Sequence, residues 1–485
     1  MRCAVIIPPW IPTDLFPART ARAQLNYWQP LGTLYVASSL ARAGHEVRFL
    51  DGAFMGHDAI LDEVATFRAD WVGIHSTAFG WKAARRVAAD VRARLPRAFV
   101  CAGGPYPTAA PERCLAEEPA LDAAVVGEGE RTAVEVLERM GAGLDLAGVR
   151  GIAWRDEGGT IRLNLPRAPD TRLDELPFPD RSFLGDAARY LPPPAMYRRA
   201  PVAVVMTSRG CNRQCIFCFQ LDRARRGGVR YRSVENVLAE VELCLAQGFR
   251  EIKFIDDTFA QDRRRALAIA REIRRRGLDF TWFASACVNQ VDPELLQAFR
   301  EAGCWAILFG VESGVQRNLN TLRKGITLAQ ARNAVRWAKQ AGLHVQTTFV
   351  LGIPGETTQD ALQTIDFACE LAPDVASFHA LVPFPGTWLH DHAHELGTVS
   401  AELTDYTYQG AAFVPHGMTR EEIQALRQRA YRRFYSRPAF LLRRLLRLRS
   451  GRDLAIALRG AGTLLRLWTE RGVFHVAPGR RERAA

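Results

Sequence analysis

The sequence predicts an α/β protein made of two α/β units in series, followed by a helical and basic carboxyl-terminal region. Short apolar runs alternate with helical stretches over residues 1–150, and the same alternation returns over residues 201–395. A loop with three cysteines follows the first apolar run of the second series. With 485 residues, of which 48% are apolar and 24% charged, the chain is long enough to form several buried cores.

In the first unit, apolar runs at 4–7, 46–51, 71–75, 99–102 and 123–126 predict strands, with a helix over residues 30–44. Their alternation with helices predicts a doubly wound, Rossmann-like parallel sheet, whose ligands bind beyond the carboxyl ends of the strands. Those ends carry small or polar residues, namely Asp51, Gly52, Ser76, Thr77, Gly103, Gly104, Pro105, Gly127, Glu128 and Gly129. Each pair alone is compatible with an ordinary turn, but four such ends together indicate a ligand site.

Residues 151–200 predict a connecting region. Two short apolar segments flank the turn at 157–159 and predict a β-hairpin. The acidic, proline-containing stretch at 173–180 then predicts an ordered linker between the two units.

The second unit, residues 201–395, predicts a partial (β/α)6 barrel. Its strand signals lie at 201–206, 251–255, 280–284, 305–309, 345–350 and 376–380, and its helical stretches include 234–246, 263–276 and 328–341. Polar groups at the carboxyl ends of such strands line the active site in full barrels. The equivalent positions here are Asp256, Asp257, Ser285, Glu312, Gly352 and Pro354.

The cysteine loop carries the most specific signal in the chain. Cys211, Cys215 and Cys218 have the spacing C-x3-C-x-Φ-C, in which the aromatic position is Phe217. Three thiolates can hold three irons of a [4Fe–4S] cube and leave the fourth iron open to a small-molecule ligand. A zinc site would need a fourth cysteine or histidine nearby, and none follows at a useful spacing. Four further cysteines are expected in the core, with the function of Cys287 left open: Cys244, Cys287, Cys304 and Cys369.

The loop and the ordered strand ends together resemble the radical SAM superfamily, over residues 201 to about 390. The resemblance implies that S-adenosylmethionine (SAM) chelates the open iron and is cleaved reductively to a 5′-deoxyadenosyl radical. It implies an adenine contact for Phe217 and a methionyl amino contact for Asp256 and Asp257. It also implies ribose or methionyl contacts for Ser285 and Glu312, and backbone contacts to adenine from Gly352 to Pro354.

Structural roles remain open for the three acidic residues. Asp256 and Glu312 would alternatively form internal salt bridges with Lys253 or Arg323, and Asp257 would cap the following helix.

The first unit resembles the cobalamin-binding domain of B12-binding radical SAM proteins. The resemblance rests on Pro30-Leu31-Gly32, Gly44-His-Glu-Val, the 103–105 turn and Val126-Gly-Glu-Gly-Glu130. The D-x-H-x-x-G pattern of domains with a histidine ligand would fall on residues 51–56, where Ala53 replaces the histidine. We therefore expect cobalamin to bind without a histidine below the cobalt. Structural roles are expected for His45, His57 and His75.

The carboxyl-terminal region, residues 396–485, is rich in arginine. Ten arginines lie between residues 420 and 449, and the whole chain has a net charge of +12. The 419–422 segment predicts a capping box, and residues 440–448 and 454–468 predict amphipathic helices with a basic face. Such helices would either cover the barrel or dock on an anionic membrane surface. Nucleic acid is disfavoured because no RNA-binding module is evident.

No apolar run approaches the ~18 residues needed to span a bilayer, and the amino terminus lacks the features of a signal peptide, so a cytoplasmic protein is expected. The resemblance implies a cobalamin-dependent radical SAM C-methyltransferase that methylates an unactivated carbon, supplied with electrons by a donor such as flavodoxin or ferredoxin. The substrate would be a small molecule, and a lipid-like or tetrapyrrole compound would suit membrane docking.

Three other functions stay open. A non-methylating enzyme would resemble the anaerobic oxidative cyclase of magnesium-porphyrin synthesis. A methylthiotransferase would need a second cluster, for which only Cys3, Cys101 and Cys114 supply the count. A cobalamin or redox sensor would signal through the basic tail.

Overall fold

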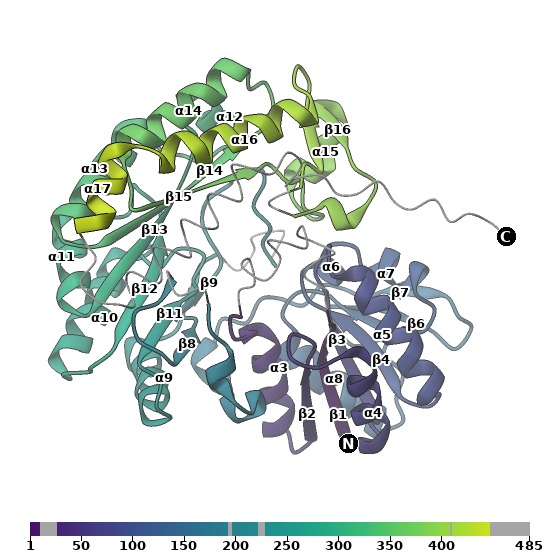
Figure 1. The fold of residues 1–485 in the computed structure, drawn as a ribbon. Helices are drawn as coiled ribbons and strands as arrows, with labels where there is room; N and C mark the ends of the chain where they lie inside the picture. The colour runs from purple at the N-terminus through teal and green to yellow at the C-terminus, as the bar shows by residue number, and fades with distance from the viewer. Residues whose placement is uncertain (10–26, 193–195, 222–227, 408–409, 447–485) are drawn as a thin grey trace.

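The structure, a computed structural model, describes residues 1–9, 27–192, 196–221, 228–407 and 410–446. It contains two α/β units, as the sequence predicts. In Figure 1 the first unit lies at the lower right, and the second curves over it at the upper left. The concave side of the second sheet faces the first unit.

The first unit is built on a seven-stranded sheet with the order β2-β1-β3-β4-β5-β6-β7. Strands β1 to β5 are parallel, and β6 and β7 add an antiparallel edge. The strands are β1 (Arg2–Ile7), β2 (Glu46–Asp51), β3 (Trp71–His75), β4 (Phe99–Gly103), β5 (Ala123–Val125), β6 (Ile152–Arg155) and β7 (Ile161–Leu163). The strand order reverses between β1 and β3, which is the switch point where doubly wound sheets bind ligands.

Helices cover both faces of this sheet. Helices α3 (Leu31–Arg42) and α8 (Gly129–Gly141) bury apolar side chains against one face. The opposite face is covered by α4 (His57–Phe67), α5 (Trp81–Arg94), α6 (Pro105–Ala109) and α7 (Pro111–Glu117). The predicted hairpin is present as β6 and β7, and it extends the first sheet because β6 pairs with β5.

The linker between the units is ordered by three short 3-10 turns: η2 (Leu173–Glu175), η3 (Arg181–Leu184) and η4 (Ala187–Arg189). It lies against the first unit, where the hydroxyl of Tyr190 donates a 2.9 Å hydrogen bond to Asp51.

The second unit is a partial barrel of six parallel strands in the order β15-β14-β13-β12-β11-β8. The strands are β8 (Val202–Val205), β11 (Glu251–Phe254), β12 (Thr281–Ala286), β13 (Cys304–Glu312), β14 (His344–Leu351) and β15 (Val375–Ala380). The helices between them are α9 (Val234–Ala246), α10 (Arg263–Arg275), α11 (Pro293–Glu301), α12 (Gln316–Thr321), α13 (Leu328–Gln340) and α14 (Thr358–Leu371). These helices pack on the convex face, where the largest core of the molecule lies.

Smaller elements complete the second unit. Two two-stranded sheets pair β9 (Ser208–Arg209) with β10 (Arg230–Tyr231), and β16 (Gly397–Val399) with β17 (Phe413–Pro415). Helix α15 (Trp388–Leu396) and the turn η6 (Leu403–Asp405) precede α16 (Arg420–Tyr435) and α17 (Pro438–Leu446). The predicted capping box begins α16, with the Thr419 hydroxyl accepting from the Glu422 amide and the Glu422 carboxylate accepting from the Thr419 amide.

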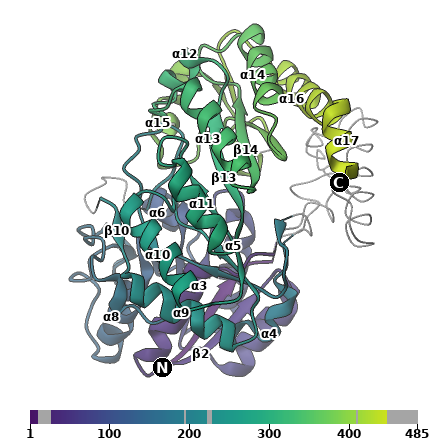
Figure 2. The ribbon, with the colours of Figure 1, turned by 90° about the vertical axis from the view of Figure 1, so that its left-hand side faces the viewer.

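Helix α16 covers the edge of the barrel. It lies beside α14 in both ribbon views (Figures 1 and 2). The hydroxyls of Tyr431 and Tyr435 accept hydrogen bonds from the backbone amides of Phe378 and Ala376 on β15. This part of the basic region therefore protects a strand edge.

The basic region continues as α17, which coincides with most of the helix predicted at 440–448. Residues 454–468 lie outside the described residues. No helix in the described part of the chain combines the length and the apolar character needed to cross a bilayer.

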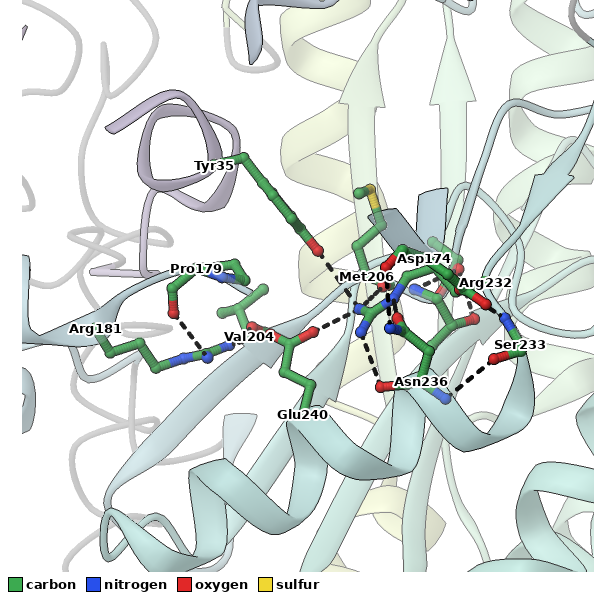
Figure 3. Close-up of polar contacts among 12 residues, drawn as sticks. Tyr35, Asp174, Pro179, Arg181, Val204, Met206, Arg232, Ser233, Asn236 and Glu240 are labelled. Atoms are coloured by element: carbon green, nitrogen blue, oxygen red, sulfur yellow. Dashed lines mark hydrogen bonds and ion pairs between the residues drawn. The ribbon is translucent and has the colours of Figure 1, made fainter. Parts of the chain in front are cut away.

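A buried ionic cluster joins the two units (Figure 3). Glu240 of α9 has no exposed side-chain surface, and its carboxylate lies 2.7 Å from Arg181 of the linker and 2.5 Å from Arg232. Arg232 also lies 3.4 Å from the hydroxyl of Tyr35, which belongs to α3 of the first unit. The cluster therefore connects α3, the linker and the second unit.

Candidate active site

A cavity of about 460 Å³ lies between the two units. From the first unit it is lined by the start of α3, by strand residues of β1, β3, β4 and β5, and by the loops that follow β4 and β5. From the second unit it is lined by Met206, Ser208, Arg209, Gly210, Phe219, Gln220, Leu221, Gly228, Arg230, Ile255 and Asp257. One cavity therefore contacts the carboxyl edge of the first sheet, the end of the cysteine loop and the end of β11.

Eight of the residues predicted to contact cobalamin line this cavity: Leu31, Gly32, Gly103, Gly104, Pro105, Gly127, Glu128 and Gly129. Gly104 has a φ of +104°, and a Cβ there would lie 2.7 Å from Nδ1 of His75. Glycine is therefore required at this turn, because a side chain would be both strained and in collision. The backbone at these strand ends is open to close approach by a flat ligand.

The other predicted contacts lie outside the cavity and have local partners. Asp51 accepts hydrogen bonds from the Ala53 amide and the Tyr190 hydroxyl. Gly52 allows close packing of two loops, since a Cβ would lie 2.2 Å from the backbone nitrogen of Pro9. The Ser76 and Thr77 hydroxyls bond to nearby backbone atoms, and Pro30 immediately precedes α3.

The cavity extends deeper than the sequence suggested, between the first sheet and helices α3 and α8. Trp71 and Gly73 line this inner part, and the buried indole N–H of Trp71 has no hydrogen-bond partner among the described residues. A Cβ at Gly73 would collide with the Trp71 ring at 2.3 Å. A glycine inside a strand signals such close packing, and it was the sequence feature that could have revealed this region.

These features fit cobalamin. The glycine-rich strand ends suit a flat macrocycle. The inner part of the cavity, beside Trp71, has apolar walls and one hydrogen-bond donor, the Trp71 indole N–H, which suit a narrower group attached to the macrocycle. His75, expected to be structural, also lines the cavity, and burial lowers the pKa of its imidazole to about 4.

Glu128, predicted to contact cobalamin, also forms ion pairs between the two units. Its carboxylate lies 3.2 Å from Arg209 and 2.7 Å from Arg230. Arg209 also pairs with Glu130 at 2.5 Å. Because Arg209 lies two residues before Cys211, these contacts attach the cobalamin-binding unit directly to the start of the cysteine loop.

The cysteine loop is held from several sides. Oδ1 of Asp256 accepts hydrogen bonds from the Thr207 amide, the Thr207 hydroxyl and the Ser208 hydroxyl, at 2.5–3.0 Å. The backbone of Ile216 bonds to residues 322 and 389. Asp256 therefore anchors the strand that leads into the loop, while its buried Oδ2 has no partner in the part of the chain that the structure describes.

The three thiols face a common set of charges. Burial raises the pKa of the Cys211 and Cys215 thiols, and the negative charge of Asp257 raises the pKa of Cys211 further. The ammonium of Lys324 acts in the opposite direction on Cys215 and Cys218. The thiols therefore lie close enough to one another to interact electrostatically, and Cys215 and Cys218 also interact with Lys324.

This donor set fits an iron–sulfur cube. Among the described residues, no set of three or more His, Cys, Asp and Glu side chains is arranged to hold one metal ion. The cube does not need such a set, because each thiolate binds a different iron.

Glu312 pairs with Lys324, not with Lys253 or Arg323, the two partners predicted from the sequence. Its carboxylate lies 2.6 Å from Nζ of Lys324, and both side chains are largely buried. Glu312 has a φ of +69°, a left-handed conformation that non-glycine residues adopt only when surrounding contacts hold them there. Lys324 also faces the thiols, so the pair forms one wall of the cysteine site.

The other predicted SAM contacts are placed around the same end of the barrel. Phe217 packs against an apolar cluster that contains Ile353, so it lies near the 352–354 loop. The amides of Gly352 and Ile353 already donate to the carboxylate of Glu356, at 2.6 and 3.2 Å. A ligand at this loop would therefore meet carbonyl groups and side chains, including Pro354, rather than these two amides. Ser285 lies near the carboxyl end of β12.

The comparisons with known proteins agree with this architecture. Residues 205–368 match the family model of the radical SAM superfamily, and residues 21–137 match that of the B12 binding domain. An uncharacterized methyltransferase of Pyrococcus horikoshii is 36% identical, over 85% of this chain and 89% of that protein. Cytidylyl-2-hydroxyethylphosphonate methyltransferase of Streptomyces wedmorensis is 30% identical, over 84% and 86%. Anaerobic magnesium-protoporphyrin IX monomethyl ester cyclase of Rubrivivax gelatinosus is 27% identical, over 85% and 75%.

Solved structures share the fold. The radical SAM methyltransferase TsrM of Kitasatospora setae superposes with a TM-score of 0.69 at 20% identity, covering 88% of each chain. The cobalamin-dependent SAM radical enzyme OxsB gives a TM-score of 0.73 at 16% identity, covering 96% of this chain and 71% of that one. The radical SAM domain implies a [4Fe–4S] cluster and SAM, and the B12-binding domain implies cobalamin. The chain therefore belongs to the B12-binding radical SAM family and is a cobalamin-dependent radical SAM enzyme.

Proposed function

We propose that this enzyme is a C-methyltransferase that methylates an unactivated carbon of a small molecule. The observation that supports it most directly is the shared cavity, which contacts both the cobalamin-binding strand ends and the segment that follows Cys218. When bound, the cluster with SAM supplies a carbon-centred radical, and the corrinoid supplies a methyl group. A substrate between them would be open to both.

The residues of the chain have distinct roles in this proposal. Cys211, Cys215 and Cys218 hold the cube, and the Lys324–Glu312 pair forms a charged wall beside it. The ion pairs from Arg209 to Glu128 and Glu130 keep the two units in register across the cavity. Largely apolar walls exclude water, which protects a radical from side reactions.

Two relatives with methyltransferase names support the transfer of a methyl group, and the cyclase relative supports the alternative, a non-methylating radical reaction. The two are separated by incubating anaerobic, cobalamin-loaded enzyme with methyl-labelled SAM and a host metabolite extract. The proposal expects label in a product and formation of 5′-deoxyadenosine. Product formation without label would refute methyl transfer and favour the alternative.

The methylthiotransferase alternative is disfavoured by the positions of the three extra cysteines. Cys3 and Cys101 are buried in the core under α3 and α8, whereas Cys114 is buried in the core on the opposite face of the sheet. One cube cannot reach thiols on two faces of a sheet.

A further inference from the structure

Lys253 has an unusual position in the barrel. It lies on β11, where the side chains of Ile252 and Phe254 enter the core on the convex face. Because successive side chains of a strand point to opposite faces, Lys253 and Ile255 point to the concave face, toward the first unit. Lys253 is half-buried, and Ile255 is 39% exposed.

Two aromatic rings lie against the Lys253 ammonium. Its Nζ lies 4.0 Å from the ring centroid of Phe283 and 4.4 Å from that of Trp28. In the part of the chain that the structure describes, Lys253 forms no ion pair and no side-chain hydrogen bond. Glu251, two residues earlier on the strand, instead accepts from the backbone of residues 198 and 199, from Thr281 and from the indole of Trp305.

The neighbouring strands supply no other charge. On the concave face, the side chains beside Lys253 are Val204 and Met206 from the β8 segment and Phe283 and Ser285 from β12. Desolvation is the only cause that shifts the pKa of Lys253, and it lowers that pKa to about 8. Two aromatic faces attract a cation, but they do not replace the hydrogen bonds that the ammonium loses. Among the residues that the structure describes, this site therefore holds a positive charge without a counter-ion.

Lys253 is not itself in the cavity wall, but it lies next to it, two residues before Ile255, the residue that follows β11. Ile255 and Asp257, further along the same strand and its extension, both line the cavity. With a rise of ~3.3 Å per residue, the Lys253 Cα lies about 7 Å from that of Ile255. Asp257 in turn interacts electrostatically with the thiols of Cys211 and Cys218. A small molecule with one end near the cluster could therefore place its other end at Lys253.

We propose that Lys253 is the binding subsite for an oxyanion of the substrate, either a carboxylate or a phosphate-type group. The aromatic faces of Phe283 and Trp28 hold the lysine side chain in place for this contact. The inference rests on the proposed function, because it concerns the substrate of the same cavity, and it narrows the substrate class to anionic small molecules.

The first test uses methyl-labelled SAM with a metabolite extract separated on an anion exchanger at neutral pH. We expect labelled product only from the retained fraction. Lys253→Met should lower labelling at limiting substrate by roughly 10- to 100-fold, the loss expected when a hydrogen bond to a charged group is removed. Lys253→Arg should recover most of it. Lys82→Met, on the exposed surface of α5, is the matched control and should have no effect.

Label from the unretained fraction, or wild-type labelling by Lys253→Met, would overturn the inference while leaving methyl transfer intact. Phosphatase treatment distinguishes the two oxyanions, because it releases the product from the exchanger only if the group is a phosphate. Formation of 5′-deoxyadenosine without extract should be the same in all variants, which separates loss of substrate binding from damage to the cluster.

A second test does not depend on activity. Trinitrobenzenesulfonate reacts with unprotonated amines, and modified peptides are identified by mass spectrometry. Inorganic phosphate or acetate should slow modification of Lys253 in the holoenzyme and leave Lys82 unaffected. If neither anion protects Lys253, the inference fails even where methyl transfer is observed. If protection is found but no label is ever transferred, the proposed function fails and the anion site stands.

Discussion

Removing the charge of Glu240 should destabilise the contact between the two units. The carboxylate has no exposed surface and lies within 2.7 Å of both Arg181 and Arg232, whose side chains are each 2% exposed (Figure 3). Glu240→Gln would leave two guanidinium groups buried without a counter-charge. Breaking a buried ion pair from one side costs about 3–5 kcal/mol, most of it from the charge left behind. We therefore expect a loss of that size in the free energy of unfolding.

The assay is urea unfolding of the anaerobic protein followed by circular dichroism, with the first transition used for comparison because a two-unit protein need not unfold in one step. Glu242→Gln is the control on the same helix. Glu242 pairs with Arg276 at 3.0 Å, but the side chains are 45% and 24% exposed, so its loss should cost about 1 kcal/mol or less. Equal losses of unfolding free energy in the two variants would refute the argument that burial makes the Glu240 ion pairs more stabilising than an exposed pair.

Three further predictions concern the active site. Cys215→Ala should abolish 5′-deoxyadenosine formation while leaving corrinoid binding, measured by absorbance, unchanged; loss of both would contradict the division into two units. Lys324→Met should lower the reduction potential of the cluster, because a positive charge near Cys215 is lost. The potential is measured by redox titration monitored by electron paramagnetic resonance, and an unchanged potential would mean that Lys324 lies too far from the cluster to affect it. Burial raises the pKa of Glu356 to about 7, above its usual value near 4.5. Protonated Glu356 therefore stabilises the folded state at low pH, and this contribution, about 3 kcal/mol, is lost as pH rises from about 4.5 to about 7. Glu356→Gln should remove this part of the pH dependence of the free energy of unfolding.

The alternation of apolar runs predicted both sheets because each parallel strand carries its own local signal. The cysteine spacing and the polar strand ends are also short-range signals in the sequence. The structure places Gly104 and Asp257 in the wall of one cavity, and Cys211 close enough to Asp257 to interact with it electrostatically. Local reasoning also placed Cys3 and Cys101 in strands, where the structure buries them.

Contacts between distant residues could not be predicted in this way. The partner of Glu312 is Lys324, not Lys253 or Arg323, because the turn after α12 decides which cation reaches the strand end. Glu128 lies in the predicted cavity, but its ion pairs with Arg209 and Arg230 depend on how the two units meet. The inner cavity beside Trp71 arises from packing between a sheet and two helices, and no single motif encodes it.

The central claim is that one chain carries a cube on the 211–218 loop and a corrinoid across the shared cavity. The most direct measurement is the iron, sulfide and corrinoid content of the anaerobically reconstituted protein, with Cys215→Ala prepared in parallel. We predict about four irons per chain, as one cube requires, together with one corrinoid that is retained by the variant when its cluster is lost. About eight irons per chain and no corrinoid would contradict the claim.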